Sequence, residues 1–143
     1  MTPKRAQFVE WCQSQLGKPY IWGAKGPDTF DCSGLITAGL LACGHEDWRQ
    51  THNSARLFDK LEPVEKPEVG DFAFYGPPHR VTHVMVVWFD GQVYGASGGN
   101  RDTITPRPGA AVQTKRRVFY RRDFRGFRKN PLKESPHGNA EQP

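Results

Sequence analysis

The stretch CSGLITAGLLAC, residues 32–43, limits the possible folds of this chain more than any other part of the sequence. Its leucines and isoleucine fall on nearly every side of a helix, with alanine and glycine between them, and Gly44 ends the pattern. A helix that is apolar almost all round has to be enclosed by other elements. The sequence therefore predicts a central buried helix over residues 32–43.

The order of the remaining elements predicts an α+β fold. Apolar residues at helical spacing predict a helix over about residues 3–16, and a shorter one is expected at about 54–61 with Asn53 or Ser54 as its cap. Strand patterns follow at residues 71–75, 82–89, 92–96 and 117–121. Asp90-Gly91 between two of these runs predicts a hairpin. We expect the N-terminal helices to pack on one face of a central antiparallel sheet.

The length of 143 residues is enough for one domain with its own core. Near the C-terminus the sequence NPLKESPHGNAEQP offers little to bury. We therefore expect a compact domain over residues 1–128 and a flexible tail over residues 129–143.

The chain is basic, with a formal net charge of +5, and much of the excess lies between residues 115 and 129. Such a segment suits a polyanion, which includes nucleic acid and anionic wall polymer, but it equally suits a solvated surface. The sequence lacks zinc-finger spacing and the usual RNA-binding aromatic signature, so no specific nucleic-acid partner is expected.

The cysteines and the N-terminus indicate where the chain is made. Three cysteines without a C-x-x-C pair argue against a disulfide framework and for a reducing compartment. The first residues lack the apolar core of a signal peptide, and no run approaches the roughly 18 apolar residues of a membrane span. We expect synthesis in the cytoplasm without a signal peptide and no membrane span.

Cys32 differs from the other two cysteines by its position. Cys12 and Cys43 fit small apolar core residues, whereas Cys32 opens the buried helix and is preceded by Asp31. Free backbone N–H groups and the positive end of the helix dipole at that position are expected to lower the thiol pKa. The same N–H groups can hold the oxyanion of a tetrahedral intermediate. Cys32 is therefore a candidate nucleophile.

His83 is the candidate base among five histidines because it opens an apolar strand, where a polar side chain lies at the rim of the sheet. His45, His52, His79 and His137 lie in polar segments and are expected to be solvated. His79 and His83 are four residues apart, a zinc spacing on a helix, but the prolines before them and the valines around them favour a strand. No metal and no cofactor is expected.

Three segments resemble, in order, the blocks of the NlpC/P60 cysteine peptidases: LGKPYIWGAKGPDTFDCSGLI, VGDFAFY and THVMVVWFDGQVYGAS. The resemblance covers about residues 5–100. It implies a papain-like α+β fold, and it implies hydrolysis of peptidoglycan stem peptides at the amide bond between γ-D-glutamate and a diamino acid. The expected partner is thus a peptidoglycan peptide.

The resemblance also implies roles for single residues. Cys32 matches the nucleophile and His83 the general base, Tyr20 matches a tyrosine that lines the site, and Asp31 and Ser33 match the residues that flank the nucleophile and shape the substrate groove.

One position departs from the family pattern. About twelve residues after the base the family usually has a third polar residue that orients the imidazole, and here that position is Gly95. Ser97 is our tentative third residue; Asn100, a backbone carbonyl or a water molecule are the alternatives.

The segments GASGGN and YRRDFRGF resemble small NlpC/P60 proteins encoded in phage tail regions. This suggests phage tail proteins as partners and a virion-associated enzyme that acts on the bacterial wall. Two other functions stay open: a non-catalytic wall-binding or structural tail module of the same fold, and a thiol amidase or acyltransferase that acts on another amide or ester.

Overall fold

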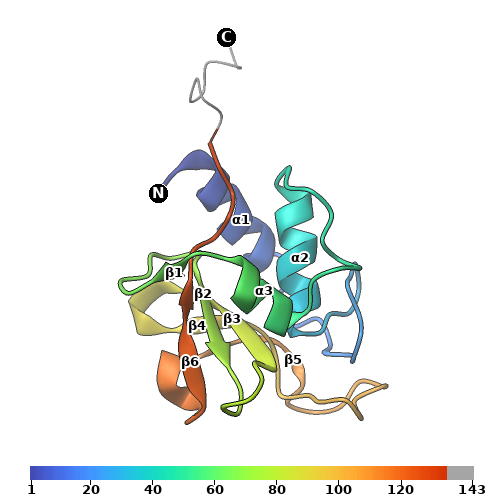
Figure 1. Ribbon diagram of the computed structural model, residues 1–143. Coiled ribbons are helices and arrows are strands. Elements are labelled where there is room, and N and C mark those ends of the chain that lie inside the picture. Colours follow the sequence, from blue (N-terminus) through green and yellow to red (C-terminus); the bar gives the residue numbers. More distant parts are fainter. Residues whose placement is uncertain (135–143) are drawn as a thin grey trace.

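The buried helix expected at the centre is α2, Cys32–Ala42, in a computed structural model that describes residues 1–134 (Figure 1). Asp31 begins the helix, because its carboxylate accepts a hydrogen bond from the Gly34 N–H at 2.7 Å. Helix α1, Pro3–Gln13, packs beside α2, and α3, Ser54–Lys60, is capped by the Asn53 side chain. The three helices thus match those predicted from the sequence, with each end within about a turn.

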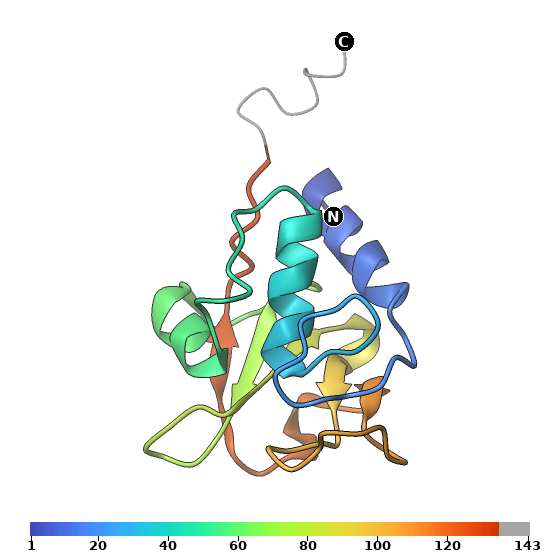
Figure 2. The same cartoon turned by 90° about the vertical axis from the view of Figure 1, so that its right-hand side faces the viewer.

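A single antiparallel sheet carries the helices on one face, in the strand order β1-β6-β2-β3-β4-β5 (Figure 2). Its strands are β1 Pro63–Val64, β2 Phe72–Tyr75, β3 His83–Val87, β4 Val93–Ser97, β5 Ala111–Lys115 and β6 Phe124–Arg128. The main core lies between this face and the helices, where α2 crosses β3 and β4. The α+β class predicted from the sequence is confirmed.

The hairpin predicted at Asp90-Gly91 joins β3 to β4. Both residues have a positive φ, 56° and 75°, which is the backbone that a tight two-residue hairpin requires. Val86 consequently pairs with Tyr94 and Val87 with Val93. This pairing sets which residues of β3 and β4 share a face of the sheet.

The strand predicted over residues 117–121 is wrong. Val118–Tyr120 forms a short 3₁₀ turn, η2, between β5 and β6, two strands that we had not predicted. The turn lies against the face of the sheet that the helices leave free, and there the Tyr75 hydroxyl donates a hydrogen bond to the Val118 carbonyl at 2.7 Å. This tertiary contact overrides the local strand preference of the segment.

The first residues of the expected C-terminal tail are packed. Asn130 is 2% exposed, and its backbone N–H donates to the Asp71 carboxylate while its side chain donates to the Gly70 carbonyl. Leu132 packs against the main core. Residues 129–134 therefore continue the fold, and the remainder of the expected tail, residues 135–143, lies outside the described residues.

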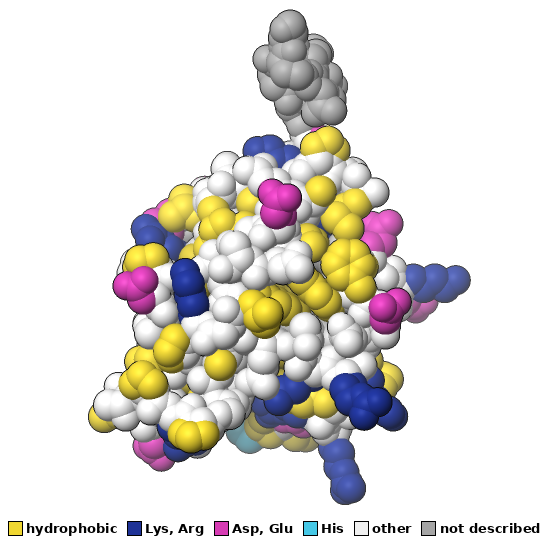
Figure 3. All heavy atoms as spheres, turned by 180° about the vertical axis from the view of Figure 1, so that it is seen from behind, with side chains coloured by type: hydrophobic (Ala, Val, Ile, Leu, Met, Phe, Trp, Pro, Cys, Tyr) yellow, Lys and Arg dark blue, Asp and Glu magenta, His cyan; other side chains and the backbone are white. Residues whose placement is uncertain are grey.

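Several cations of the basic segment 115–129 are used within the fold. Arg128 lies 3.6 Å from the centre of the Phe58 ring and donates to the Phe58 carbonyl, and Arg125 donates to the Pro77 carbonyl. Other Lys and Arg side chains gather at the lower end of the face shown in Figure 3. Among residues 1–134, no helix has the length and apolar character needed to span a bilayer.

Candidate active site

The nucleophile candidate lies where a glycine-rich loop crosses the start of α2. The Asp31 carboxylate binds both parts, because one oxygen accepts from the Gly34 N–H and the other from the Gly23 N–H at 2.9 Å. The crossing is close: a Cβ added to Gly34 would lie 2.1 Å from the Ala24 carbonyl oxygen. Glycine is therefore required two residues after the cysteine for the loop to pass over the helix end.

Burial dominates the chemistry of the Cys32 thiol, which is 7% exposed. Removal of the thiol from water is the larger cause and the negative charge of Asp31 the smaller one, and together they raise the pKa of Cys32 to about 12. Hydrogen bonds from the N–H groups of Val84, Ser33 and Cys32 itself act in the opposite direction and are outweighed. The lowered pKa expected from the helix terminus is therefore wrong, and the thiol holds its proton at neutral pH.

His83 is also buried, and its ring is held in the neutral form. Burial is the main cause and the positive charge of Arg121 the second one, and they lower the pKa of His83 to about 3. A neutral imidazole has one nitrogen free to accept a proton. The site thus contains a neutral thiol and a neutral imidazole.

Tyr120 is the hydrogen-bond partner of the His83 ring. Its hydroxyl lies 2.8 Å from His83 Nε2, and the Ser97 hydroxyl lies 3.4 Å from the Tyr120 hydroxyl. Ser97, the tentative third residue, is thus connected to His83 through Tyr120. Gly95 offers no side chain to this arrangement, and a Cβ added there would lie 3.0 Å from the Met85 sulfur.

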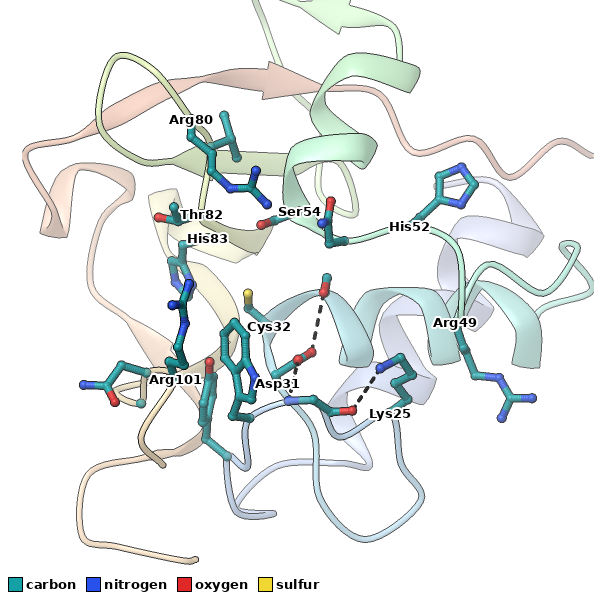
Figure 4. A pocket seen from close by; sticks show the side chains of 18 of the residues that line it. Lys25, Asp31, Cys32, Arg49, His52, Ser54, Arg80, Thr82, His83 and Arg101 are labelled. Atoms are coloured by element: carbon teal, nitrogen blue, oxygen red, sulfur yellow. Dashed lines mark hydrogen bonds between the residues drawn. The ribbon is translucent and has the colours of Figure 1, made fainter. Parts of the chain in front are cut away.

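Cys32 and His83 line the same cavity, which has a volume of about 700 Å³ (Figure 4). Figure 4 shows the Cys32 sulfur and the His83 ring both facing the cavity, from α2 and from the start of β3. Tyr20, Asp31 and Ser33 line it as well, so the structure brings these five predicted residues together. Tyr20 is packed tightly, because a Cβ added to Gly99 would lie 2.2 Å from its ring.

Sequence reasoning missed three kinds of site residue. His52, which was expected to be solvated, is 8% exposed and lines the pocket. Tyr120 lay in a segment interpreted as a strand, and no spacing rule linked it to His83. Arg80 and Arg101 lie in loops on either side of the pocket, and no sequence pattern singled them out. Within residues 1–134, no three His, Cys, Asp or Glu side chains come close enough together to hold a metal ion.

Comparisons with known sequences identify one family. The profile of the NlpC/P60 family matches residues 17–121. Protein P54 of Enterococcus faecium is 30% identical over 83% of this chain, and murein DD-endopeptidase MepH of Escherichia coli is 32% identical over 69% of it. These matches cover 21% and 35% of the two relatives, so the chain spans only a minor part of their length.

Solved structures show the same fold. The NlpC/p60 domain of the peptidoglycan hydrolase SagA superposes with a TM-score of 0.65 at 26% identity, over 88% of this chain and 97% of that domain. RipD from Mycobacterium tuberculosis, described as a non-catalytic NlpC/p60 protein adapted to peptidoglycan binding, gives a TM-score of 0.70 at 20% identity, over 92% of this chain and all of that one.

Proposed function

Because the chain belongs to the NlpC/P60 family, we propose that it is a cysteine endopeptidase that hydrolyses peptidoglycan stem peptides, at the amide between γ-D-glutamate and a diamino acid. The observation that carries this proposal is the convergence of Cys32 and His83 on one open cavity. Association with phage tail proteins or a virion, and the site of action on the bacterial wall, stay predictions.

In the proposed mechanism Cys32 attacks the amide carbonyl and His83 accepts the thiol proton during the attack. Since the thiol is neutral at rest, proton transfer accompanies formation of the carbon–sulfur bond rather than preceding it. His83 then protonates the leaving amine, and water hydrolyses the thioester. Tyr120 is the positioning residue: when Nε2 donates its proton to the Tyr120 oxygen, the other ring nitrogen is left free as the base.

The start of α2 supplies the oxyanion site. The N–H groups of Cys32 and Ser33 have no acceptor one turn earlier in the helix, and both act to lower the pKa of the Cys32 thiol. An oxyanion formed on the carbon attacked by that sulfur would lie within their reach. The Asp31 carboxylate accepts a hydrogen bond from the next N–H group, that of Gly34, and so holds the helix end in this orientation.

A second candidate is a wall-binding module without catalysis. It is favoured by the neutral thiol and by the absence of a charged partner for His83 Nε2 among the described residues, since a phenol stabilises an imidazolium less than a carboxylate does. This reading predicts saturable binding to wall material without the release of peptide amines.

Digestion of purified diaminopimelate-type peptidoglycan, followed by mass spectrometry, separates the two candidates. We expect cleaved stem peptides from the unchanged protein and none from Cys32→Ala. Intact wall in both digests, with retained binding, would establish the module instead. Equal cleavage by both proteins would show that Cys32 is not the nucleophile.

Tyr120→Phe is expected to lower kcat about tenfold to hundredfold and to leave KM nearly unchanged. The change leaves the buried Nε2–H of His83 without an acceptor, which costs about 1–3 kcal/mol, while the aromatic contact with Tyr75 is kept. Steady-state kinetics on a stem peptide measures the effect. Ser97→Ala is the matched control, with a smaller loss expected because Ser97 contacts only Tyr120 in this chain of hydroxyls. A kcat equal to that of the unchanged protein would exclude positioning by Tyr120.

The pH dependence follows from the lowered pKa of His83. The base is neutral above about pH 3, so kcat/KM is expected to stay level from pH 8 to pH 5. If the base were a histidine with an ordinary pKa near 6.5, kcat/KM would fall about 30-fold over the same range. The free energy of unfolding behaves differently. In the unfolded chain His83 binds a proton below about pH 6.5, whereas in the folded protein it stays neutral down to about pH 3. Stability is therefore expected to fall as the pH drops from about 6.5 towards 3. Thermal unfolding at each pH separates the two effects, and a kcat/KM that halves near pH 6.5 in folded protein would contradict the prediction.

A further inference from the structure

The pocket beside Cys32 is bordered by an excess of positive charge. The cations that line it are Lys25, Arg49, Arg80, Arg101 and Arg121, and the acidic side chain among its described lining residues is Asp31. Both carboxylate oxygens of Asp31 are already bonded to backbone N–H groups of the loop and the helix. The pocket therefore presents net positive charge to whatever enters it.

Three of these cations have partners within the protein. Arg49 forms a two-point ion pair with Asp47, with N···O distances of 2.9 and 2.8 Å. Arg121 forms a similar pair with Asp123 at 2.9 and 2.6 Å. Lys25 donates to the Gly23 carbonyl at 2.9 Å. Their capacity to bind a ligand is reduced accordingly.

Arg80 and Arg101 differ, because neither forms an ion pair within residues 1–134. Figure 4 shows them reaching the pocket from two separate loops, on either side of His83. Arg101 lies 5.9 Å from the centre of the Trp22 ring, which is 50% exposed. The two guanidinium groups thus flank the reacting pair with their hydrogen-bonding capacity unused by acidic side chains of the fold.

We propose that Arg80 and Arg101 make this pocket selective for peptides that carry free carboxylates next to the scissile amide, so that wall peptides with these groups amidated are poorer substrates. The inference rests on the proposed function, since it names the substrate class of the same site. A guanidinium binds a carboxylate through two parallel hydrogen bonds and gains far less from a neutral amide. A cleft lined by one sign of charge also raises the local concentration of the oppositely charged ligand.

The test compares two synthetic stem peptides that contain a γ-D-glutamyl-diaminopimelate amide and differ only in the glutamyl α-group, which is a carboxylate in one and a carboxamide in the other. For the unchanged protein we expect kcat/KM to be about tenfold higher for the carboxylate peptide at low salt. The ratio should approach one in the double variant Arg80→Gln/Arg101→Gln. It should also shrink in 0.5 M salt, because partly exposed charges are screened.

The matched control is Arg116→Gln/Arg117→Gln, which removes the same charge from two exposed residues that do not line the pocket. It is expected to keep the full preference, which would separate the local effect from the net charge of the chain. A preference retained by Arg80→Gln/Arg101→Gln, or absent from the unchanged protein, would overturn the proposal.

Binding to the Cys32→Ala protein distinguishes failure of this proposal from failure of the proposed function. The emission of the half-exposed Trp22 next to Arg101 provides the readout, with Trp22→Phe to identify its contribution. Tighter binding of the carboxylate peptide, even if no protein cleaves either peptide, supports the selectivity and refutes only the enzyme. Equal binding of the two peptides refutes the selectivity whatever the activity.

Discussion

Replacement of His83 by alanine is expected to lower kcat/KM for a stem peptide by about 10²–10⁴-fold, because the buried neutral thiol of Cys32 then has no group to accept its proton. Cys32→Ala should abolish turnover, and the double variant should be no worse than Cys32→Ala alone, since the two groups act as a unit. Steady-state kinetics and end-point digestion measure these losses.

Two further variants make this prediction about His83 specific. His83→Gln keeps a polar group near the Tyr120 hydroxyl but cannot act as a base, so it should be as inactive as His83→Ala with less effect on folding. His79→Ala changes an exposed histidine outside the pocket and is expected to have full activity. Activity in His83→Gln close to that of the unchanged protein would remove His83 from the mechanism.

Asp71→Ala is expected to lower the free energy of unfolding by about 3–5 kcal/mol, as found when one partner of a buried ion pair is removed. The Asp71 side chain is 4% exposed and forms an ion pair of 3.0 Å with Arg5 of α1. Its two oxygens also accept the backbone N–H groups of Glu68 and Asn130. One carboxylate therefore joins the first helix, the start of β2 and the C-terminal segment. Urea denaturation followed by circular dichroism measures the loss.

The control for Asp71 is Asp47→Ala, which removes an exposed ion pair with Arg49 and should leave stability nearly unchanged. Arg5→Ala/Asp71→Ala should lose less than the sum of the two single variants, because the double variant leaves no unpaired buried charge. If Asp71→Ala were as stable as Asp47→Ala, the ion pair would not hold these segments together.

Local patterns in the sequence were enough to predict the helices, the hairpin and the helix start at Cys32. The apolar run after Cys32 requires burial, Asp31 and Gly34 suit a helix start, and Asp90-Gly91 suits a tight turn, so each of these features depends mainly on neighbouring residues. The same locality explains the errors at the C-terminal end. Residues 117–121 and Asn130 take their conformations from Tyr75, Asp71 and Gly70, which lie more than forty residues earlier in the chain.

The sequence by itself determined the α+β class and the placement of a cysteine at the start of a buried helix and a histidine at the start of a strand, because periodicity and capping are local properties. Only the tertiary structure decided the protonation of the pair, since the pKa values of Cys32 and His83 depend on how completely the assembled fold excludes water. It also decided that Tyr120, from a turn far along the chain, contacts His83, and that Arg80 and Arg101 face the pocket without an acidic partner among residues 1–134. Such contacts between distant segments leave no periodic trace in the sequence.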